Sequence, residues 1–249
     1  MNPTPASPAR TPVGAETMSP ALRSAHNYYA WIAERFQPWL GKRVLDIGGG
    51  HGPHLDHVVA PGRFVMSIDL SPECVGEMRQ RFGAFDFEAR VGDIADGAFS
   101  AQLAACDFDT VLCVNVLEHL EDDTGALRGM ASILRSSAGR LFLLVPAHPA
   151  LYGTPDRLAG HYRRYSRRRL VRAVAAAGFE VRRSSYFNGF GAIPYLLNAR
   201  VLRPRTLSGS VDTQIVIFDR YIVPVLRRLE RVIPMPFGQS LIVCAETTP

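Results

Sequence analysis

Short apolar runs alternate with stretches of helical periodicity along most of the chain. The helical stretches cover residues 28–40, 53–59, 71–82, 117–134 and 166–177. The apolar runs are of strand length and cover residues 42–47, 63–69, 85–91, 108–114, 139–145, 179–186 and 240–245. Several of these runs are continuously apolar, which is typical of parallel strands covered on both faces. The pattern predicts an α/β fold with a doubly wound, mostly parallel, seven-stranded sheet.

End signals support several of these helices. Ser71 precedes the 71–82 helix as an N-cap, and Pro72 takes its first position. Ser166 is the N-cap of the 166–177 helix, and Gly178 follows its last residue. Gly41 ends the aromatic-rich helix of residues 28–40. These signals predict where the helices begin and end.

Two regions depart from the alternation. Residues 1–20 are rich in Pro, Ser, Thr and Ala and have no apolar period, so we expect a flexible leader without the apolar core of a signal peptide. Residues 188–238 form a long insertion before the last strand. We expect residues 21–249 to fold as one domain that includes this insertion.

The insertion has a helical pattern in its second part. Pro224 should start or kink the helix. The apolar positions at helical spacing are Ile215, Phe218, Ile222, Val225 and Leu229, and the basic positions on another face are Arg220, Arg227 and Arg231. The pattern fits a helical pair packed on the domain, a lid over an acceptor, a dimer surface, or a face that lies on anionic lipid.

Charge and cysteine usage narrow the class of protein. Residues 161–249 hold fifteen arginines against five acidic residues, so the net charge of +5 comes from this part of the chain. The four cysteines have no CxxC spacing and no histidine at metal-ligand spacing, which predicts a reduced, cytoplasmic protein with no metal. No apolar run approaches the roughly 18 residues of a membrane span.

A glycine-rich turn follows the first strand, in the sequence DIGGGHG at residues 46–52. Such a turn lets the backbone approach a ligand closely. A dinucleotide site needs G-x-G-x-x-G, and its third glycine would fall on Pro53, so this class fits poorly. A tight glycine turn without a ligand is the alternative that remains.

The D-x-G-x-G-x-G spacing resembles the first motif of class I S-adenosylmethionine (SAM)-dependent methyltransferases. Acidic or amide residues follow at the ends of the next three strands in the order of that family, and NVLEHLED at residues 115–122 resembles the motif of its small-molecule branch, which includes quinone-biosynthesis enzymes. The resemblance implies a Rossmann-like SAM methyltransferase fold with an antiparallel last strand. It implies that SAM, with S-adenosylhomocysteine as product, is held by Tyr28, Asp46, Gly48, Gly49, Gly50, Asp69, Leu70, Asp93, Ile94 and Asn115.

Methyl transfer to oxygen or nitrogen can need a base, and histidine suits that role near neutral pH. His119 is the first candidate, because similar enzymes place a Glu-His pair on the acceptor side. Its alternative role is to bond a backbone carbonyl. His148, which follows the fifth strand, is the second candidate.

Residues 145–170 resemble a segment of a bacterial subset of these methyltransferases that contains GHYRRY. The resemblance implies acceptor contacts from His148, Tyr152, His161, Tyr162, Arg163 and Arg164. Arginine can grip a carboxylate or phosphate of an anionic acceptor. The alternative is that Asp156 pairs with Arg163 or Arg164 and only holds the loop.

We therefore expect an enzyme that methylates an oxygen or nitrogen atom of a small molecule, such as a secondary metabolite, a quinone-like or a lipid-linked compound. An RNA or protein methyltransferase is the main rival, and a SAM-binding module without catalysis is another. Asn115-Val-Leu-Glu differs from the Asn/Asp-Pro-Pro-Tyr/Phe motif used on planar amines, and no RNA-binding motif occurs in the basic part.

Overall fold

We describe the fold from a computed structural model, which describes residues 20–134, 139–189, 209–233 and 235–248. The expected leader lies outside the described residues apart from Pro20. Residues 190–208 of the insertion also lie outside them. The described part of the chain contains no helix that is both long enough and apolar enough to cross a membrane.

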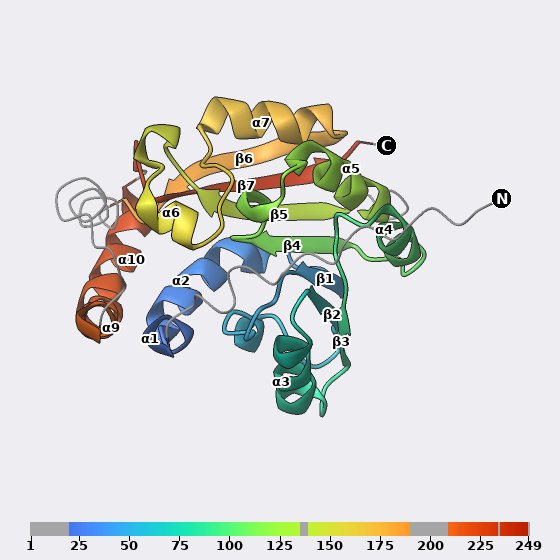
Figure 1. Ribbon diagram of the computed structural model, residues 1–249, viewed down its shortest axis with the longest axis horizontal. Helices are drawn as coiled ribbons and strands as arrows, with labels where there is room; N and C mark the ends of the chain where they lie inside the picture. Colours follow the sequence, from blue (N-terminus) through green and yellow to red (C-terminus); the bar gives the residue numbers. More distant parts are fainter. Residues whose placement is uncertain (1–19, 135–138, 190–208, 234, 249) are drawn as a thin grey trace.

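One seven-stranded sheet forms the centre of the molecule (Figure 1). Its order is β3-β2-β1-β4-β5-β7-β6, and β7 runs antiparallel to both of its neighbours while the other pairs are parallel. The strands are β1 (Arg43–Ile47), β2 (Phe64–Asp69), β3 (Phe87–Val91), β4 (Thr110–Val114), β5 (Arg140–Pro146), β6 (Phe179–Phe187) and β7 (Ser240–Thr247). The predicted doubly wound sheet and its antiparallel last strand are confirmed.

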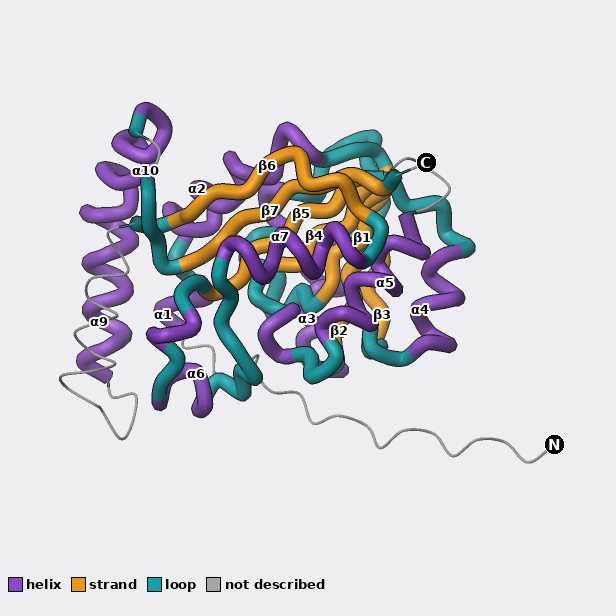
Figure 2. The backbone as a smooth tube through the Cα atoms, turned by 90° about the horizontal axis from the view of Figure 1, so that it is seen from above, coloured by secondary structure: helices purple, strands orange, loops and turns teal. Residues whose placement is uncertain are grey.

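Helices cover both faces of the sheet, as Figures 1 and 2 show. One face packs against α4 (Gly97–Ala104), α5 (Asp123–Leu134) and α7 (Arg167–Ala176). The other packs against α2 (His26–Phe36), α3 (Pro72–Phe82) and α10 (Val223–Val232). The shorter elements are α1 (Pro20–Arg23), η1 (Gln37–Trp39), η2 (Leu55–His57), η3 (Leu117–His119), η4 (Pro149–Leu151), α6 (Thr154–Leu158), α9 (Gly209–Ile217) and the π-helical turn η6 (Phe218–Ile222).

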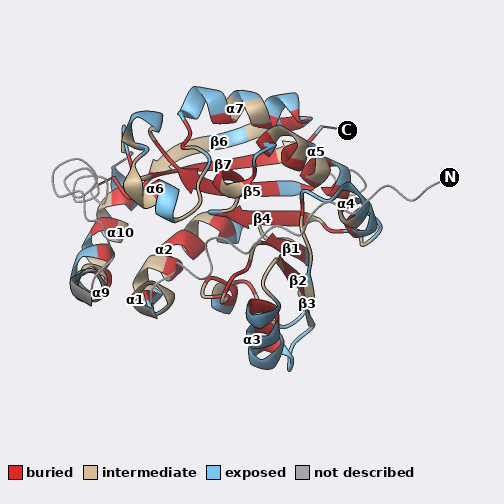
Figure 3. Cartoon of the chain, viewed as in Figure 1, coloured by how far each residue is buried: buried red, intermediate tan, exposed pale blue. Residues whose placement is uncertain are grey.

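Strand β4 shows why the sheet needs two covering layers. Val111 and Cys113 pack into the core on the α5 side, whereas Leu112 and Val114 pack on the α2 side. Successive side chains of a strand point to opposite faces, so a continuously apolar strand must be buried on both. Figure 3 shows this burial in the central strands.

The Ser71 and Ser166 cap predictions hold. The aromatic-rich helix ends at Phe36 and not at Gly41, and two other helix predictions were wrong. Ser71 and Ser166 accept hydrogen bonds from Cys74 N and Arg169 N, as N-caps do. The expected helix 53–59 is only the 3-10 turn η2. The expected helix 117–134 is divided, because Asp122 accepts a hydrogen bond from Gly125 N and starts a new helix there. Helix α4, capped by Asp96, was not predicted.

The insertion buries only part of the apolar face that its pattern predicted, since Phe218 packs against the core but other members of that face do not. Val225 and Ile222 are 61% and 43% exposed, while the inward positions are Asp219, Val223, Leu226 and Glu230. Polar contacts decide this, because buried carboxylates need partners. Asp219 and Glu230 both accept hydrogen bonds from backbone N–H groups of the domain. Pro224 does lie in the first turn of α10, as predicted.

Candidate active site

The glycine turn after β1 requires glycine for two reasons. Gly48, Gly50 and Gly52 have φ values of +70°, +55° and +67°, a region that side chains rarely adopt. At Gly49 a Cβ would lie 2.1 Å from the Ser67 hydroxyl, so there is no space for one. At Gly50 a Cβ would meet no atom within 4 Å. The turn is therefore tight on its inner side and open at Gly50.

Asp46 lies beneath this turn and is fully buried. Its Oδ1 lies 2.7 Å from His54 Nε2, and its Oδ2 accepts a hydrogen bond of 2.7 Å from the Ser67 hydroxyl. The sequence prediction gave Asp46 a direct cofactor contact. Its carboxylate lies under the turn and contacts His54 and Ser67, which were not among the predicted site residues, and the cofactor contact of Asp46 stays a prediction.

Asp69 ends β2 and joins the glycine turn to the next helix. Its Oδ2 accepts a hydrogen bond from Gly50 N (2.8 Å) and its Oδ1 accepts one from Ser71 N (2.9 Å). Each carboxylate oxygen can accept a second hydrogen bond, so Asp69 can still take ligand hydroxyls. Leu70 lies beside it, half-buried.

The third strand end is tied to the second, because Gly92 N donates to Asp69 O (3.0 Å). Asp93 accepts a hydrogen bond from Ala95 N through Oδ1 (2.8 Å), and the Ile94 side chain packs into the core. These contacts hold the Asp93–Ile94 turn at the same end of the sheet as Asp69.

Asn115 follows β4 at the point where the strand order reverses. Open α/β sheets bind ligands at such a switch point. Its φ is +54°, its backbone N–H donates to Leu144 O (2.8 Å), and its side chain is exposed. The parallel pairing of β1 with β2 and β4 brings Asn115, Asp69 and the glycine turn to one end of the sheet.

An acid–base cluster of Glu118, His119 and His161 lies just beyond β4. One ligand atom from each of the three residues lies within 4.8 Å of the others, and the rings of the two histidines meet edge to face with centroids 4.7 Å apart. Glu118 Oε2 and His119 Nδ1 are buried with no hydrogen-bond partner among the described residues. Three donor atoms at this spacing can also admit a cation. Glu118 lies within the NVLEHLED motif but was not among the predicted site residues.

Burial shifts the pKa values in this cluster in opposite directions. Burial raises the pKa of the Glu118 carboxyl to about 7. It lowers the pKa of His119 to about 4, and His161 lowers it further, while a hydrogen bond to the backbone of Gly160 acts against both. Perturbed groups grouped in this way at strand ends are typical of functional sites. The hydrogen bond between His119 and the backbone of Gly160 is the alternative role that the sequence analysis left open for this histidine.

Asp156 holds His161 in the cluster. It is buried, and its Oδ1 lies 3.0 Å from His161 Nδ1 and accepts a hydrogen bond of 2.7 Å from Arg164 Nε. Burial would raise the pKa of Asp156, but the His161 hydrogen bond and the Arg164 charge outweigh it and lower the pKa to about 2. The pair Asp156–Arg164, one of the two alternatives above, is therefore present.

Two of the predicted acceptor contacts are already engaged within the protein. Arg164 is 3% exposed in its side chain and also donates to Ala147 O. Arg163 pairs with Asp123 Oδ2 at 2.9 Å and donates to Glu121 O, so the alternative pair Asp156–Arg163 is wrong. Both guanidinium groups therefore contact other residues of the protein, and acceptor binding by these two arginines stays a prediction.

The aromatic and histidine side chains of this segment are placed differently. Tyr162 is 51% exposed. The Tyr152 hydroxyl donates to His161 O at 2.7 Å, so Tyr152 supports the backbone beside the cluster. His148 has a φ of +60°, and its ring stacks on Tyr186 with centroids 5.1 Å apart. His148 is thus separate from the three residues of the cluster.

Tyr28 on α2 approaches the cluster from the opposite layer. Burial, and to a lesser degree Glu118, raises the pKa of its hydroxyl to about 12. Its backbone N–H donates to Asp219 Oδ1 (2.7 Å) on η6. The insertion therefore positions Tyr28, a role of Asp219 for which the sequence carried no signal.

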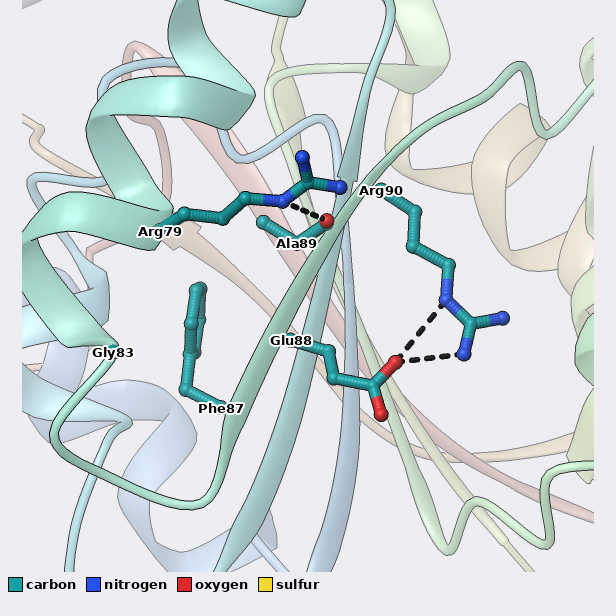
Figure 4. Close-up of a pocket in the computed structure, with 6 residues that line it drawn as sticks. All are labelled: Arg79, Gly83, Phe87, Glu88, Ala89 and Arg90. Atoms are coloured by element: carbon teal, nitrogen blue, oxygen red, sulfur yellow. Dashed lines mark hydrogen bonds and ion pairs between the residues drawn. The ribbon is translucent and has the colours of Figure 1, made fainter.

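A shallow hollow of about 280 Å³ lies elsewhere, between α3 and the edge strand β3 (Figure 4). Arg79 Nε donates to Ala89 O there, and Arg90 pairs with Glu88. The polar groups of this hollow thus bond to one another, and it lies apart from the strand ends described above.

Comparisons with known proteins agree with the geometry. The methyltransferase domain family matches residues 21–184. The ubiquinone biosynthesis O-methyltransferase of Xanthomonas axonopodis pv. citri (strain 306) is 35% identical over 115 residues, 45% of this chain and 46% of that protein. The corresponding enzyme of Aeromonas salmonicida (strain A449) is 30% identical over 113 residues, 45% of this chain and 47% of that protein. The chain thus spans about half the length of these curated relatives.

Solved structures show the same fold at low identity. A SAM-dependent methyltransferase from Archaeoglobus fulgidus superposes with a TM-score of 0.54 at 17% identity, over 88% of this chain and 94% of that one. The magnesium protoporphyrin IX methyltransferase of Synechocystis PCC 6803, with bound S-adenosylhomocysteine, gives 0.55 at 17% identity over 92% and 86%. The predicted Rossmann-like fold and the family resemblance are both confirmed, and the chain belongs to the methyltransferase domain family.

Proposed function

We propose that this protein transfers a methyl group from SAM to an oxygen or nitrogen atom of a small-molecule acceptor. The observation that carries this proposal is the Gly48–Gly52 turn, whose open position at Gly50 is bonded directly to Asp69 at the switch point of the sheet. The family match and the ubiquinone O-methyltransferase relatives support the same class of reaction.

The residues at the strand ends fit SAM. Gly50 leaves space for a ligand against the backbone, and Asp69 retains lone pairs for ribose hydroxyls. Asp93, Ile94 and Asn115 would complete the adenosine and amino-acid contacts, with Tyr28 on the side of the cluster. SAM supplies an electrophilic methyl group on a sulfonium, so holding the acceptor in line is the main task of the protein.

The acid–base cluster would receive the acceptor and its proton. A buried neutral imidazole is available at neutral pH because the pKa of His119 is about 4. His161 is oriented by Asp156, whose carboxylate would stabilise the imidazolium that forms when a proton arrives. We therefore propose the pair His119–His161 as the base, with Asp156 as a positioning residue. His148 remains a second, more distant candidate.

A narrower proposal concerns the acceptor itself. The Tyr28 ring and a buried titratable cluster together suit a phenolic or amine acceptor, whose ring or chain could contact Tyr28 while its O–H or N–H meets the cluster. A lipid-linked acceptor fits this description, since α2, which carries Tyr28, packs against α10 at the edge of the molecule.

Isothermal titration with SAM, S-adenosylhomocysteine and NAD tests the cofactor. Binding of the first two and not of NAD is expected, and binding of NAD alone would contradict the proposal.

Turnover of labelled SAM with a panel of phenols and amines then tests the base. We expect His161→Asn and His119→Ala to lower kcat and leave SAM affinity unchanged. Full turnover in both variants would show that the pair is not the base. Loss of turnover on addition of a chelator would show that the cluster binds a cation and does not act as the base.

A further inference from the structure

The face of the α9–η6–α10 column that points away from the domain is apolar and basic. We define this outer face by eight exposed side chains of the column: Val216, Ile217, Arg220, Tyr221, Ile222, Val225, Arg228 and Val232. Its apolar members are between 43% and 80% exposed, and Val232 is the most exposed of them. Figure 2 shows the column as an outlying layer beyond α2.

The exposed apolar residues follow the helix axis and form a stripe. Ile217, Tyr221 and Val225 are four residues apart, and Arg228 and Val232 continue the row at steps of three and four. Residues at this spacing lie on one side of a helix. Buried Val223, Leu226 and Glu230 occupy the opposite side. The column therefore has an inner face packed on the domain and an outer face that is apolar along four turns.

The charge on the outer face has one sign. Arg220 and Arg228 are exposed and have no ion-pair partner among the described residues. Arg220 lies over the Tyr221 ring, 5.6 Å from its centroid. None of the described acidic side chains of the column is exposed, since Asp219 and Glu230 are buried and Asp212 is half-buried. The face therefore complements an apolar surface that carries negative charge.

We propose that the outer face docks on an anionic lipid bilayer surface. An amphipathic helix with apolar residues between arginines lies in the interface of such a membrane, where the apolar side chains enter the headgroup boundary and the guanidinium groups meet phosphates. A second copy of the chain is a poorer partner, because a two-fold contact would bring the unpaired Arg220 and Arg228 of both copies together without acidic partners.

The column that carries the outer face lies close to the candidate active site, so docking on a membrane would affect how an acceptor reaches that site. The column is tied to α2, since Asp219 accepts hydrogen bonds from the backbone N–H groups of Asn27 and Tyr28. Membrane docking would thus hold the Tyr28 side of the site near the bilayer, from which an apolar acceptor could enter. This use rests on the proposed function, whereas the docking itself does not.

Vesicle flotation of the full chain, without SAM or acceptor, tests the docking. We expect the protein to float with vesicles of phosphatidylcholine and phosphatidylglycerol, to float little with phosphatidylcholine alone, and to be released as salt rises. Each of Arg220→Gln and Arg228→Gln should weaken partitioning about fivefold, the factor that ~1 kcal/mol per basic residue represents. The double variant Tyr221→Glu/Val225→Glu should abolish it.

Matched controls separate the outer face from general charge and hydrophobicity. Arg168→Gln/Arg172→Gln removes two exposed arginines from α7, and Phe85→Glu places a charge at an exposed aromatic residue elsewhere. Both should partition as the unchanged chain does. Stabilisation by SAM is measured for every variant, so that loss of cofactor binding is distinguished from loss of docking.

Three results would overturn the proposal. They are failure of the unchanged chain to float with anionic vesicles, equal losses in the α7 control, and a Tyr221→Glu/Val225→Glu variant that turns a dimer into a monomer while still floating. The last result, read by light scattering, would assign the outer face to a second copy of the chain.

Discussion

The two ends of the candidate active site are built in different ways. The cofactor half, at the ends of β1, β2, β3 and β4, consists of short turns whose residues are neighbours in sequence or lie on adjacent parallel strands. The acceptor half joins Glu118 and His119 to His161, and Tyr28 to Asp219, which are far apart in the chain. Backbone geometry dominates the first half, and buried side-chain pairs dominate the second.

This difference determines how each half should respond to mutation. A substitution in the glycine turn should weaken ligand binding more than it destabilises the protein, because the surrounding strands keep the turn in place. A network of buried charges should lose stability first, because removal of one partner leaves the other buried and unpaired. The following predictions test that contrast, beginning with the largest effect.

Arg164→Met should be the most damaging substitution for stability. It leaves the buried Asp156 carboxylate without its guanidinium partner, and we expect the free energy of unfolding to fall by about 3–5 kcal/mol. Urea denaturation followed by circular dichroism measures this. Arg163→Met is the matched control, since Asp123 keeps its hydrogen bond from the Tyr165 hydroxyl and the loss should be only about 1 kcal/mol. Equal losses in the two variants would contradict the contrast.

Glu118→Gln should change how stability depends on pH. The pKa of Glu118 is about 7 in the folded protein, above its ordinary value of 4.5, so the unfolded chain ionises this group first. Stability that the protonated carboxyl contributes at low pH is therefore lost as pH rises through 7. Relative to the unchanged protein, the variant should gain about 2–3 kcal/mol between about pH 5 and about pH 8.

Urea denaturation at several pH values measures this gain. Glu88→Gln, on the exposed edge strand, is the control and should follow the unchanged protein. A Glu118→Gln difference that stays constant across this range would show that the carboxyl does not titrate there.

Gly50→Val should remove SAM binding while the protein stays folded. The side chain would fill the open space at Gly50, and we expect SAM affinity to fall about a hundredfold, which corresponds to ~2.7 kcal/mol. Gly62→Val is the matched control, because Gly62 also has a left-handed backbone (φ +75°) and open space but lies in the turn before β2. Isothermal titration should show normal affinity in the control. Equal loss in both would mean that strain, and not ligand space, is responsible.

Ser71→Ala should have the smallest effect of this series. It removes the N-cap of α3, which accepts a hydrogen bond from Cys74 N, and should cost about 1 kcal/mol. Thermal unfolding measures the loss, and Ser71→Asp should restore most of it because aspartate also caps helices. A loss as large as that of Arg164→Met would show that the cofactor half also depends on a buried network.

The strands and turns of the cofactor half could be predicted well because their determinants are local. Apolar runs placed the strands to within a few residues, and Ser71 marked a true helix start. The 53–59 helix failed because the side chain of His54 bonds to Asp46 and the chain makes only a 3-10 turn there. A contact between side chains of two different elements outweighed the local pattern in that case.

The sequence by itself determined the doubly wound sheet, the glycine turn and the end of the sheet at which the candidate site lies, because these follow from periodicity, glycine conformation and strand connectivity. Only the tertiary structure decided what the side chains of the second half do. Arg164 became a buried partner of Asp156, and the apolar stripe with Val225 faces outward, because the carboxylates of Asp156, Asp219 and Glu230 could be buried only where distant partners met them.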